Sequence, residues 1–144
     1  MDAITMWEQY ASANGICAEY DARCFGDDAD TLAELVLKGI KTATASAYPL
    51  YELEGEELPK EGQYSVVLWQ DGSAACIIKT TKVHTTAFSD ISPEQAYKEG
   101  EGDRSLAYWR TVHRDFFMKE LHEAGMTFAE DMKVVCEEFV KVYP

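Results

Sequence analysis

The sequence has few positive charges. Among its 144 residues, 13 are Lys or Arg and 26 are Asp or Glu, which gives a formal net charge of −13. Proteins that coat duplex DNA gain affinity mainly from Lys and Arg side chains that neutralise phosphates. The composition therefore excludes a polybasic coat protein and argues against duplex DNA as a partner. With 47% hydrophobic and 27% charged residues, the chain has ordinary globular usage, and we expect one folded domain over residues 1–144.

Long hydrophobic runs are also missing. No stretch approaches the roughly 18–20 apolar residues that cross a bilayer. Residues 1–8 lack the basic start and the apolar core of an export signal. We therefore expect a cytoplasmic protein with no membrane partner.

The usual motifs for metals and phosphates are absent. The four cysteines show no CxxC spacing and the three histidines form no HxxxH pattern, so a zinc site is not expected. No Gly-rich phosphate loop occurs, which argues against dinucleotides and nucleoside triphosphates. The sequence thus predicts neither a metal nor a cofactor.

Periodicity and turn residues predict a mixture of helices and strands. Helices are expected near residues 4–14, 30–38, 93–99 and 105–124, and strands near residues 42–47, 64–69, 74–81 and 132–143. Asp71-Gly72 predicts a hairpin, and residues 48–61 an exposed loop. Since helices and strands do not alternate regularly, the predicted class is α+β, with a small, mostly antiparallel sheet or barrel and flanking helices.

Some details of these elements are also predicted. Asp30 is expected to cap the helix that Gly39 ends. A bulge is expected in the last strand around Glu137-Glu138. The long helix is expected to bury one apolar side, formed by Leu106, Trp109, Val112, Phe116 and Leu121.

The segment from Leu37 to Ser46 carries most of the chemical information. A helix ends at Gly39, Lys41 follows, and a strand then alternates hydroxyl side chains with alanines. Lys41 and Thr44 would point to opposite faces of a regular strand. They can meet only if Lys41 still belongs to the turn. The alternative is a surface lysine beside a Thr-rich strand.

Gly39-Ile40-Lys41-Thr42-Ala43-Thr44 resembles the G-x-K-x-x-T signature of the ASCH (activating-signal-cointegrator homology) domain family. The likeness to bacterial single-domain members extends over roughly residues 20–142, through Phe25-Gly26-Asp27, Glu99-Gly100-Glu101-Gly102-Asp103 with Trp109, and Val134-Val135-Cys136-Glu137-Glu138-Phe139. It implies a PUA-like fold, a small β-barrel with helices over a cleft, with residues 1–20 as an N-terminal helical extension.

The resemblance also implies a link to RNA. Some members are regarded as RNA-binding modules, at least one bacterial member is a ribonuclease, and a shorter bacterial type hydrolyses the amide of acetylated cytidine nucleosides. The functional residues of that hydrolase type match Lys41, Thr44 and Glu101 here. Glu99 and Asp103 are close enough to be alternatives for the acid.

The roles of these three residues remain open at the level of sequence. Lys41 could be a deprotonated base or a cationic clamp on an oxyanion. Thr44 could be a nucleophile or hold a carbonyl by a hydrogen bond, and Glu101 could protonate the departing amine. If Glu101 is ionised beside Lys41, the pair is a structural salt bridge instead.

Further substrate contacts are expected near the motif. Thr42 and Ser46 supply hydroxyls, and Tyr48 follows directly as a candidate to stack on a base. Many family members carry an arginine where this chain has Ser46, which weakens the case for a phosphate contact there. His84 and His113 are isolated, and we expect neighbours to satisfy them.

Positive charge gathers in segments without acids, namely residues 35–51, 72–89 and 104–114. We expect these segments to converge on one cleft, so that Lys79 and Arg104 join Lys41 at the substrate.

The leading hypothesis is recognition of RNA or a modified nucleoside in this cleft, with amide hydrolysis or ribonuclease action. A nucleoside carries no phosphate and is compatible with an acidic protein. The alternatives are a non-catalytic RNA-binding module and a protein-interaction domain with an acidic surface.

Overall fold

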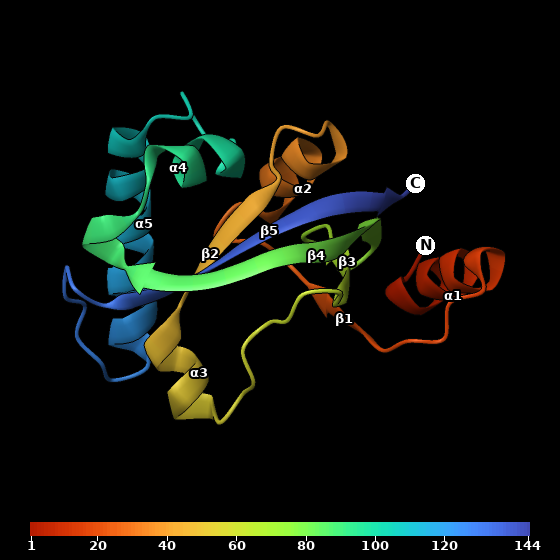
Figure 1. The fold of residues 1–144 in the computed structure, drawn as a ribbon, viewed down its shortest axis with the longest axis horizontal. Coiled ribbons are helices and arrows are strands. Elements are labelled where there is room, and N and C mark those ends of the chain that lie inside the picture. Colours follow the sequence, from red (N-terminus) through yellow and green to blue (C-terminus); the bar gives the residue numbers. More distant parts are fainter.

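The computed structural model describes residues 1–144 and contains five α-helices and five strands (Figure 1). In chain order the elements are α1 (Ala3–Asn14), β1 (Tyr20–Arg23), α2 (Ala29–Leu37), β2 (Ala43–Ala47), α3 (Tyr48–Glu54), β3 (Tyr64–Leu68), β4 (Ala74–Ala87), a 3-10 turn (Phe88–Asp90), α4 (Pro93–Glu99), α5 (Leu106–Glu123) and β5 (Lys133–Tyr143).

The strands form one mixed sheet in the order β1-β3-β4-β5-β2. β1 runs parallel to β3, and the other neighbours are antiparallel. The α+β class is confirmed. The predicted barrel is not found, because β1 and β2 remain two separate edges and the sheet does not close.

Local sequence signals account for most element boundaries. Asp2 caps α1 and Gly15 ends it in a left-handed conformation. Ser92 caps α4 through the amide of Gln95. The Asp71-Gly72 turn joins β3 to β4 as a hairpin, as predicted.

Three local predictions are wrong. Residues 48–61 do not form a loop throughout, since α3 occupies their first half, with a proline in its first turn and Gly55 at its end. The cap of α2 is Asp28 rather than Asp30. The bulge near Glu138 lies in β4, where Thr80 pairs with Phe139 and Lys82 pairs with Glu138, so Thr81 is the extra residue.

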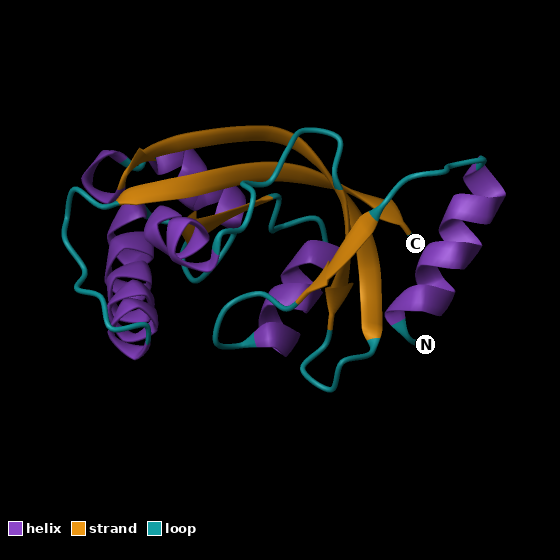
Figure 2. Cartoon of the chain, turned by 90° about the horizontal axis from the view of Figure 1, so that it is seen from below, coloured by secondary structure: helices purple, strands orange, loops and turns teal.

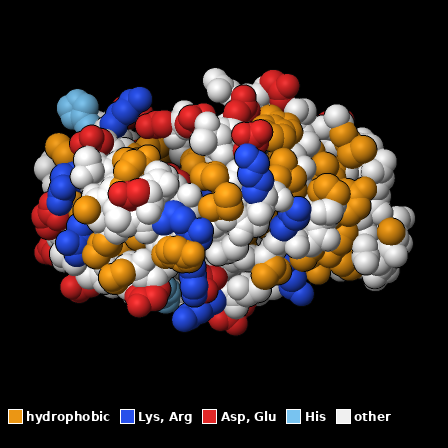
Figure 3. Space-filling view, turned by 90° about the horizontal axis from the view of Figure 1, so that it is seen from above, with side chains coloured by type: hydrophobic (Ala, Val, Ile, Leu, Met, Phe, Trp, Pro, Cys, Tyr) orange, Lys and Arg blue, Asp and Glu red, His pale blue; other side chains and the backbone are white.

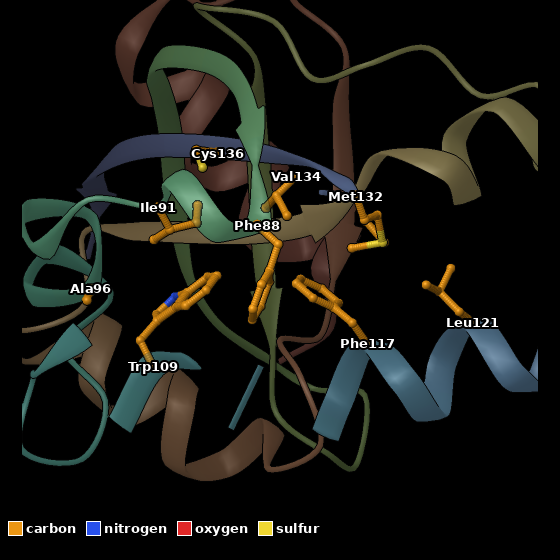
Figure 4. Close-up of a cluster of buried hydrophobic side chains, with 10 residues drawn as sticks. Phe88, Ile91, Ala96, Trp109, Phe117, Leu121, Met132, Val134 and Cys136 are labelled. Carbon is orange, nitrogen blue, oxygen red and sulfur yellow. The ribbon is translucent and has the colours of Figure 1, made fainter. Parts of the chain in front are cut away.

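The helices pack on the sheet in three separate clusters of buried side chains. α1 packs on β3 and β4 at the end where the C-terminus also lies, whereas α2 packs beside β3, β4 and β5 (Figures 1 and 2). The largest cluster joins α4 and α5 to the other end of β5, where Phe88, Trp109 and Phe117 point toward one another (Figure 4). Both α2 and α5 lie on the same side of the long strands (Figure 2).

The buried side of α5 differs from the prediction. Every fourth residue from Trp109 to Leu121 is buried, which places His113 and Phe117 in the stripe. Val112 and Phe116 lie instead beside this stripe and line a cavity. The buried stripe therefore contains an imidazole that the apolar pattern did not include.

Gly100 allows the loop after α4 to approach the turn before β2. Its φ is 75°, and a Cβ at this position would lie 2.6 Å from the carbonyl oxygen of Ile40. The amide of Thr42 donates to the carbonyl of Lys98 at 2.7 Å and joins the same two segments. A residue without a side chain is therefore required where these segments meet.

Gly100→Ala should lower the free energy of unfolding by more than about 2 kcal/mol. The left-handed backbone costs an alanine about 1–2 kcal/mol, and the new Cβ also meets the backbone of Ile40. Gly15→Ala is the matched control, because its φ is 63° and nothing lies within 4 Å of the added Cβ. Urea unfolding of both variants checks the difference, and equal losses would contradict the close approach at Gly100.

Candidate functional site

A cavity of about 460 Å³ lies between α2, α5 and the start of β2. Its walls include the side chains of Lys41, Thr44 and Glu101, which come from the turn before β2, from β2 and from the loop after α4. Phe25, Tyr108 and Phe116 add aromatic surface, and Leu32, Leu35 and Val112 of α2 and α5 add aliphatic surface. The structure thus brings together the three residues that the motif singled out.

The turn after α2 places Lys41 in this cavity. Gly39 has a left-handed backbone, and the amides of Ile40 and Lys41 both donate to the carbonyl of Leu35. Since β2 begins only at Ala43, Lys41 belongs to the turn, and this is the condition under which Lys41 and Thr44 could meet. The Lys41 residue is 2% exposed, which is unusual for a lysine.

Two carboxylates face the buried ammonium. Lys41 Nζ lies 3.2 Å from Glu101 Oε2 and 3.7 Å from Glu99 Oε1. The side chain of Glu101 is 16% exposed, whereas that of Glu99 is only 1% exposed. Glu101 is therefore the carboxylate that a ligand in the cavity can reach.

Glu99 is held by neighbours from α4 and α5. Its Oε2 accepts hydrogen bonds from Gln95 Nε2 at 3.1 Å and from the indole of Trp109. Its Oε1 lies 3.2 Å from His113 Nε2. Burial opposes ionisation, but the contact with His113 and the charge of Lys41 outweigh it, so the pKa of Glu99 lies below its ordinary value.

His113 is fixed between Trp109 and Glu99. Its ring stacks on the indole at 4.1 Å between centroids, and Nδ1 lies 2.9 Å from the carbonyl oxygen of Trp109. Burial disfavours the charged imidazole, but the contact with Glu99 outweighs it and raises the pKa of His113. Neighbours satisfy His113 as expected, but its place in the wall of this cavity was not expected.

A second, larger cavity of about 830 Å³ adjoins the first and shares Phe25, Thr44 and Phe116 with it. Arg23 Nη1 lies 3.2 Å from both carboxylate oxygens of the buried Glu137 in its wall. Ser46, another predicted substrate contact, also lies in this wall and is 2.8 Å from the hydroxyl of Tyr51.

Both cavities are acidic. Carboxylates greatly outnumber the basic residues Arg23 and Lys60 in the wall of the larger cavity: Glu19, Asp21, Glu56, Glu57, Glu61, Glu120 and Glu137. They also exceed the basic residues Lys41 and Lys119 in the smaller one: Asp27, Asp28, Glu99, Glu101 and Asp115. An anionic ligand would meet net repulsion in either.

Four residues predicted as possible site residues lie elsewhere. The hydroxyl of Thr42 donates to the carbonyl of Lys98, and Asp103 accepts from the amide of Ser105. Tyr48 lies under Lys133, and the ammonium of Lys79 lies over the ring of Tyr64. None of these four lines either cavity.

Arg104 is also outside the cavities. Its guanidinium stacks on Tyr97 at 3.6 Å and donates to the carbonyls of Tyr97 and Ile40. The expectation that Lys41, Lys79 and Arg104 converge on one cleft is therefore wrong. The acid-free segments carry these residues to different surfaces, and only Lys41 enters the cavity.

Glu99, Glu101 and His113 bring one potential metal ligand each within 4.8 Å of the others. The ammonium of Lys41 already lies between the two carboxylates. The ammonium of Lys41 therefore supplies the positive charge that these ligand atoms would otherwise attract. The donor set fits this ammonium rather than a metal ion.

None of the helices is long and apolar enough to cross a membrane.

Comparison with known proteins identifies the family. The family model described as ASCH domain matches residues 21–143. The crystal structure of an ASCH domain from Lactobacillus crispatus JV V101 is 38% identical, with a TM-score of 0.91 over 98% of this chain and 94% of that one. A protein from Enterococcus faecalis V583 is 33% identical, with a TM-score of 0.89 over 97% of this chain and 87% of that one.

One further solved structure, that of a hypothetical protein, is 16% identical. Its TM-score is 0.58 over 86% of this chain and all of that one, so this likeness shows the fold alone. No curated protein matches the sequence. The family match spans most of the chain and includes the turn of Lys41, β2 and the loop of Glu101. The chain therefore belongs to the ASCH domain family, whose PUA-like fold is associated with RNA binding.

Proposed function

We propose that the cavity around Lys41 binds a modified nucleoside without phosphates and hydrolyses an amide on its base, as in acetylated cytidine. The observation that carries the proposal is the buried ammonium of Lys41, paired with the accessible carboxylate of Glu101 in a cavity beside Thr44. A fixed cation and a carboxylate are the groups that amide hydrolysis needs, one for the oxyanion and one for proton transfer.

The size and charge of the cavity favour an uncharged ligand. A volume of about 460 Å³ lies within the range of about 300–1,000 Å³ typical of small-molecule sites. Phe25, Tyr108 and Phe116 offer surface for a base or a sugar. The excess of carboxylates disfavours a phosphate, so a free nucleoside fits better than a nucleotide or an RNA strand.

In the proposed reaction, a water molecule attacks the carbonyl carbon while the Glu101 carboxylate takes one of its protons. The carbonyl oxygen gains negative charge, which the ammonium of Lys41 stabilises. The C–N bond then breaks, and Glu101 returns its proton to the leaving nitrogen. The products are the free amine of the nucleoside and the carboxylic acid. Thr44, in the wall shared by both cavities, orients the ligand through its hydroxyl.

Lys41→Met should reduce kcat by about 10²–10³-fold, the usual effect of removing one group that stabilises an oxyanion. Methionine has a similar length but carries no charge, so it removes the cation and leaves the shape of the cavity similar. Chromatographic assay of cytidine released from acetylated cytidine measures the loss. Lys133→Met is the matched control, because Lys133 is exposed and lines neither cavity.

Single-stranded RNA is incubated in parallel with the nucleoside. Unchanged turnover of the nucleoside by Lys41→Met would overturn the proposed role of Lys41. Cleavage of RNA with no release of cytidine would replace the amide reaction by ribonuclease activity.

A second candidate function, binding of single-stranded RNA, is favoured by a basic surface outside both cavities. We define this basic surface by Lys38, Lys82, Lys98, Arg104 and Lys141. Lys141 donates to the carbonyl of Leu37 at 2.9 Å, next to Lys38, and Arg104 donates to that of Ile40. Figure 3 shows one face of the molecule, on which Lys and Arg side chains are interspersed with Asp and Glu.

One carboxylate, that of Glu138, pairs within this surface. Its oxygens lie 2.7 Å from Lys98 Nζ and 3.8 Å from Lys82 Nζ. Tyr97, which is 57% exposed, lies beneath the guanidinium of Arg104. Cations for phosphates beside an exposed ring for a base are the elements with which proteins bind single-stranded RNA.

The double variant Lys38→Glu with Lys141→Glu should bind single-stranded RNA more weakly and with a smaller dependence on salt. The slope of log affinity against log salt should fall by about 1.4, since each lost phosphate contact contributes about 0.7 for a single strand. Fluorescence anisotropy at several salt concentrations measures both quantities. The control, Lys60→Glu with Lys133→Glu, makes the same change in net charge away from this surface. Equal weakening in both double variants would contradict a localised surface.

A further inference from the structure

Glu99 and His113 form a buried pair behind Lys41, and the proposed reaction does not use either of them directly. We propose that they are positioning residues: their ion pair holds Lys41 in place as a cation and leaves Glu101 as the group that moves protons. The last part of this inference rests on the proposed function. The charge of the pair itself does not.

The hydrogen bonds around His113 determine where its protons lie. The carbonyl of Trp109 can only accept, so the imidazole Nδ1 that contacts it at 2.9 Å carries a hydrogen. A neutral ring would then present a lone pair at Nε2. That nitrogen lies 3.2 Å from Glu99 Oε1. An ionised carboxylate cannot donate and would repel a lone pair at this distance, so the close contact favours a second proton on the ring, which makes His113 an imidazolium.

The surroundings of Glu99 select the ionised carboxylate. Gln95 and Trp109 both donate to its Oε2. Its Oε1 is buried without a well-aligned hydrogen bond and faces His113 Nε2 and the ammonium of Lys41. A carboxyl proton on Oε1 could be accepted only by a neutral His113 and would remove the charge that attracts the ammonium of Lys41, whereas a carboxylate is attracted to both an imidazolium and the ammonium.

The charges in this cluster then cancel. Glu99 and Glu101 supply two negative charges, and Lys41 and His113 supply two positive ones. Burying an unpaired charge is costly, so neutral His113 would leave the buried group with an excess of negative charge. From β5, the buried thiol of Cys136 adds no charge, because burial and the nearby Glu99 raise its pKa to about 12. Asp27, Asp28 and Asp115 also line the cavity and favour positive charge.

The pair acts on the ligand through Lys41. The side chains of Lys41 and Glu99 are each 1% exposed and that of His113 is 10% exposed, and of these three only Lys41 contacts the more accessible Glu101, at 3.2 Å. With Glu99 ionised and fixed, the ammonium of Lys41 is attracted to a stationary charge behind it as well as to Glu101. Lys41 is therefore suited to stabilising negative charge, and not to accepting a proton.

The charge of His113 can be tested without a substrate, by ¹⁵N NMR of the imidazole rings across pH. We expect both ring nitrogens of His113 to be protonated at pH 7, whereas an ordinary histidine, with a pKa near about 6.5, is mostly neutral there. His113→Gln assigns the signal among the three histidines. A neutral His113 at pH 7 in the unmodified protein would overturn the proposal.

Glu99→Gln should lower the titration midpoint of His113 by at least about one pH unit, the size expected for the loss of an adjacent opposite charge. Glu94→Gln is the matched control, because Glu94 lies in the same helix but is exposed. A midpoint unchanged by Glu99→Gln would contradict the pairing. If that variant does not fold, the measurement on the unmodified protein still decides whether the imidazolium is present.

The free energy of unfolding should also depend on pH through the charge of His113. The raised pKa of His113 means that its pairing stabilises the fold fully below about pH 6.5, the ordinary value. This contribution should decline as pH rises through the raised pKa. Urea midpoints from pH 6 to pH 9 should therefore fall more in the unmodified protein than in His113→Gln. Equal slopes would contradict the ion pair.

Activity separates this inference from the proposed function. If the NMR results hold and acetylated cytidine is hydrolysed, Glu99→Gln should lower kcat more than it changes KM, and should alter the pH profile. If the NMR results hold and no nucleoside is hydrolysed, the ion pair stands and the proposed function fails.

Discussion

The buried ammonium of Lys41 is the constraint on which the rest of the site depends. A lysine that is 2% exposed needs compensating charge, because desolvating an ion costs several kcal/mol. Glu99 and Glu101 provide that charge from α4 and the loop after it, so this loop must lie against the turn before β2. The left-handed backbone at Gly100 makes the approach possible. One buried charge thereby determines where two distant segments meet and where the cavity opens.

The pairing also explains why the buried side of α5 carries a polar ring. Glu99 is also contacted from α5, since the indole of Trp109 donates to its Oε2 and His113 Nε2 lies 3.2 Å from its Oε1. The two residues are four positions apart, so both face α4 from one side of the helix. The same stripe continues with Phe117 and Leu121 into the largest hydrophobic cluster. One face of α5 thus contacts both the buried carboxylate of Glu99 and the largest hydrophobic cluster.

Local features of the fold could be predicted because short segments determine them. The Asp71-Gly72 hairpin, the end of α1 at Gly15 and the cap at Ser92 each depend on a few neighbouring residues. The open sheet could not be predicted, since closure depends on whether β1 and β2 pair with each other.

For the site, the family resemblance singled out Lys41, Thr44 and Glu101, and these three residues line one cavity. The contact of Arg23 with Glu137 joins residues 114 positions apart, and no local pattern indicates it. His113 was not expected on the buried side of α5, because a pattern of apolar residues at helical spacing leaves out a polar ring. In the structure, the carboxylate of Glu99 from α4 contacts this ring. The predicted positions of Lys79 and Arg104 were wrong, because the charge of a segment does not determine on which face of the molecule its side chains lie.

The separation of charge limits which ligands the molecule can accommodate together. The basic surface carries five cationic side chains, but none of them lines either cavity. The smaller cavity contains Lys41, yet the walls of both cavities are acidic, and a phosphate entering either would meet net repulsion. Under the two proposals, an RNA strand on the basic surface and a nucleoside in the cavity would therefore contact different side chains. Since the two candidate ligands depend on different side chains, losing one activity by mutation should leave the other intact, and each can be attributed to its own surface.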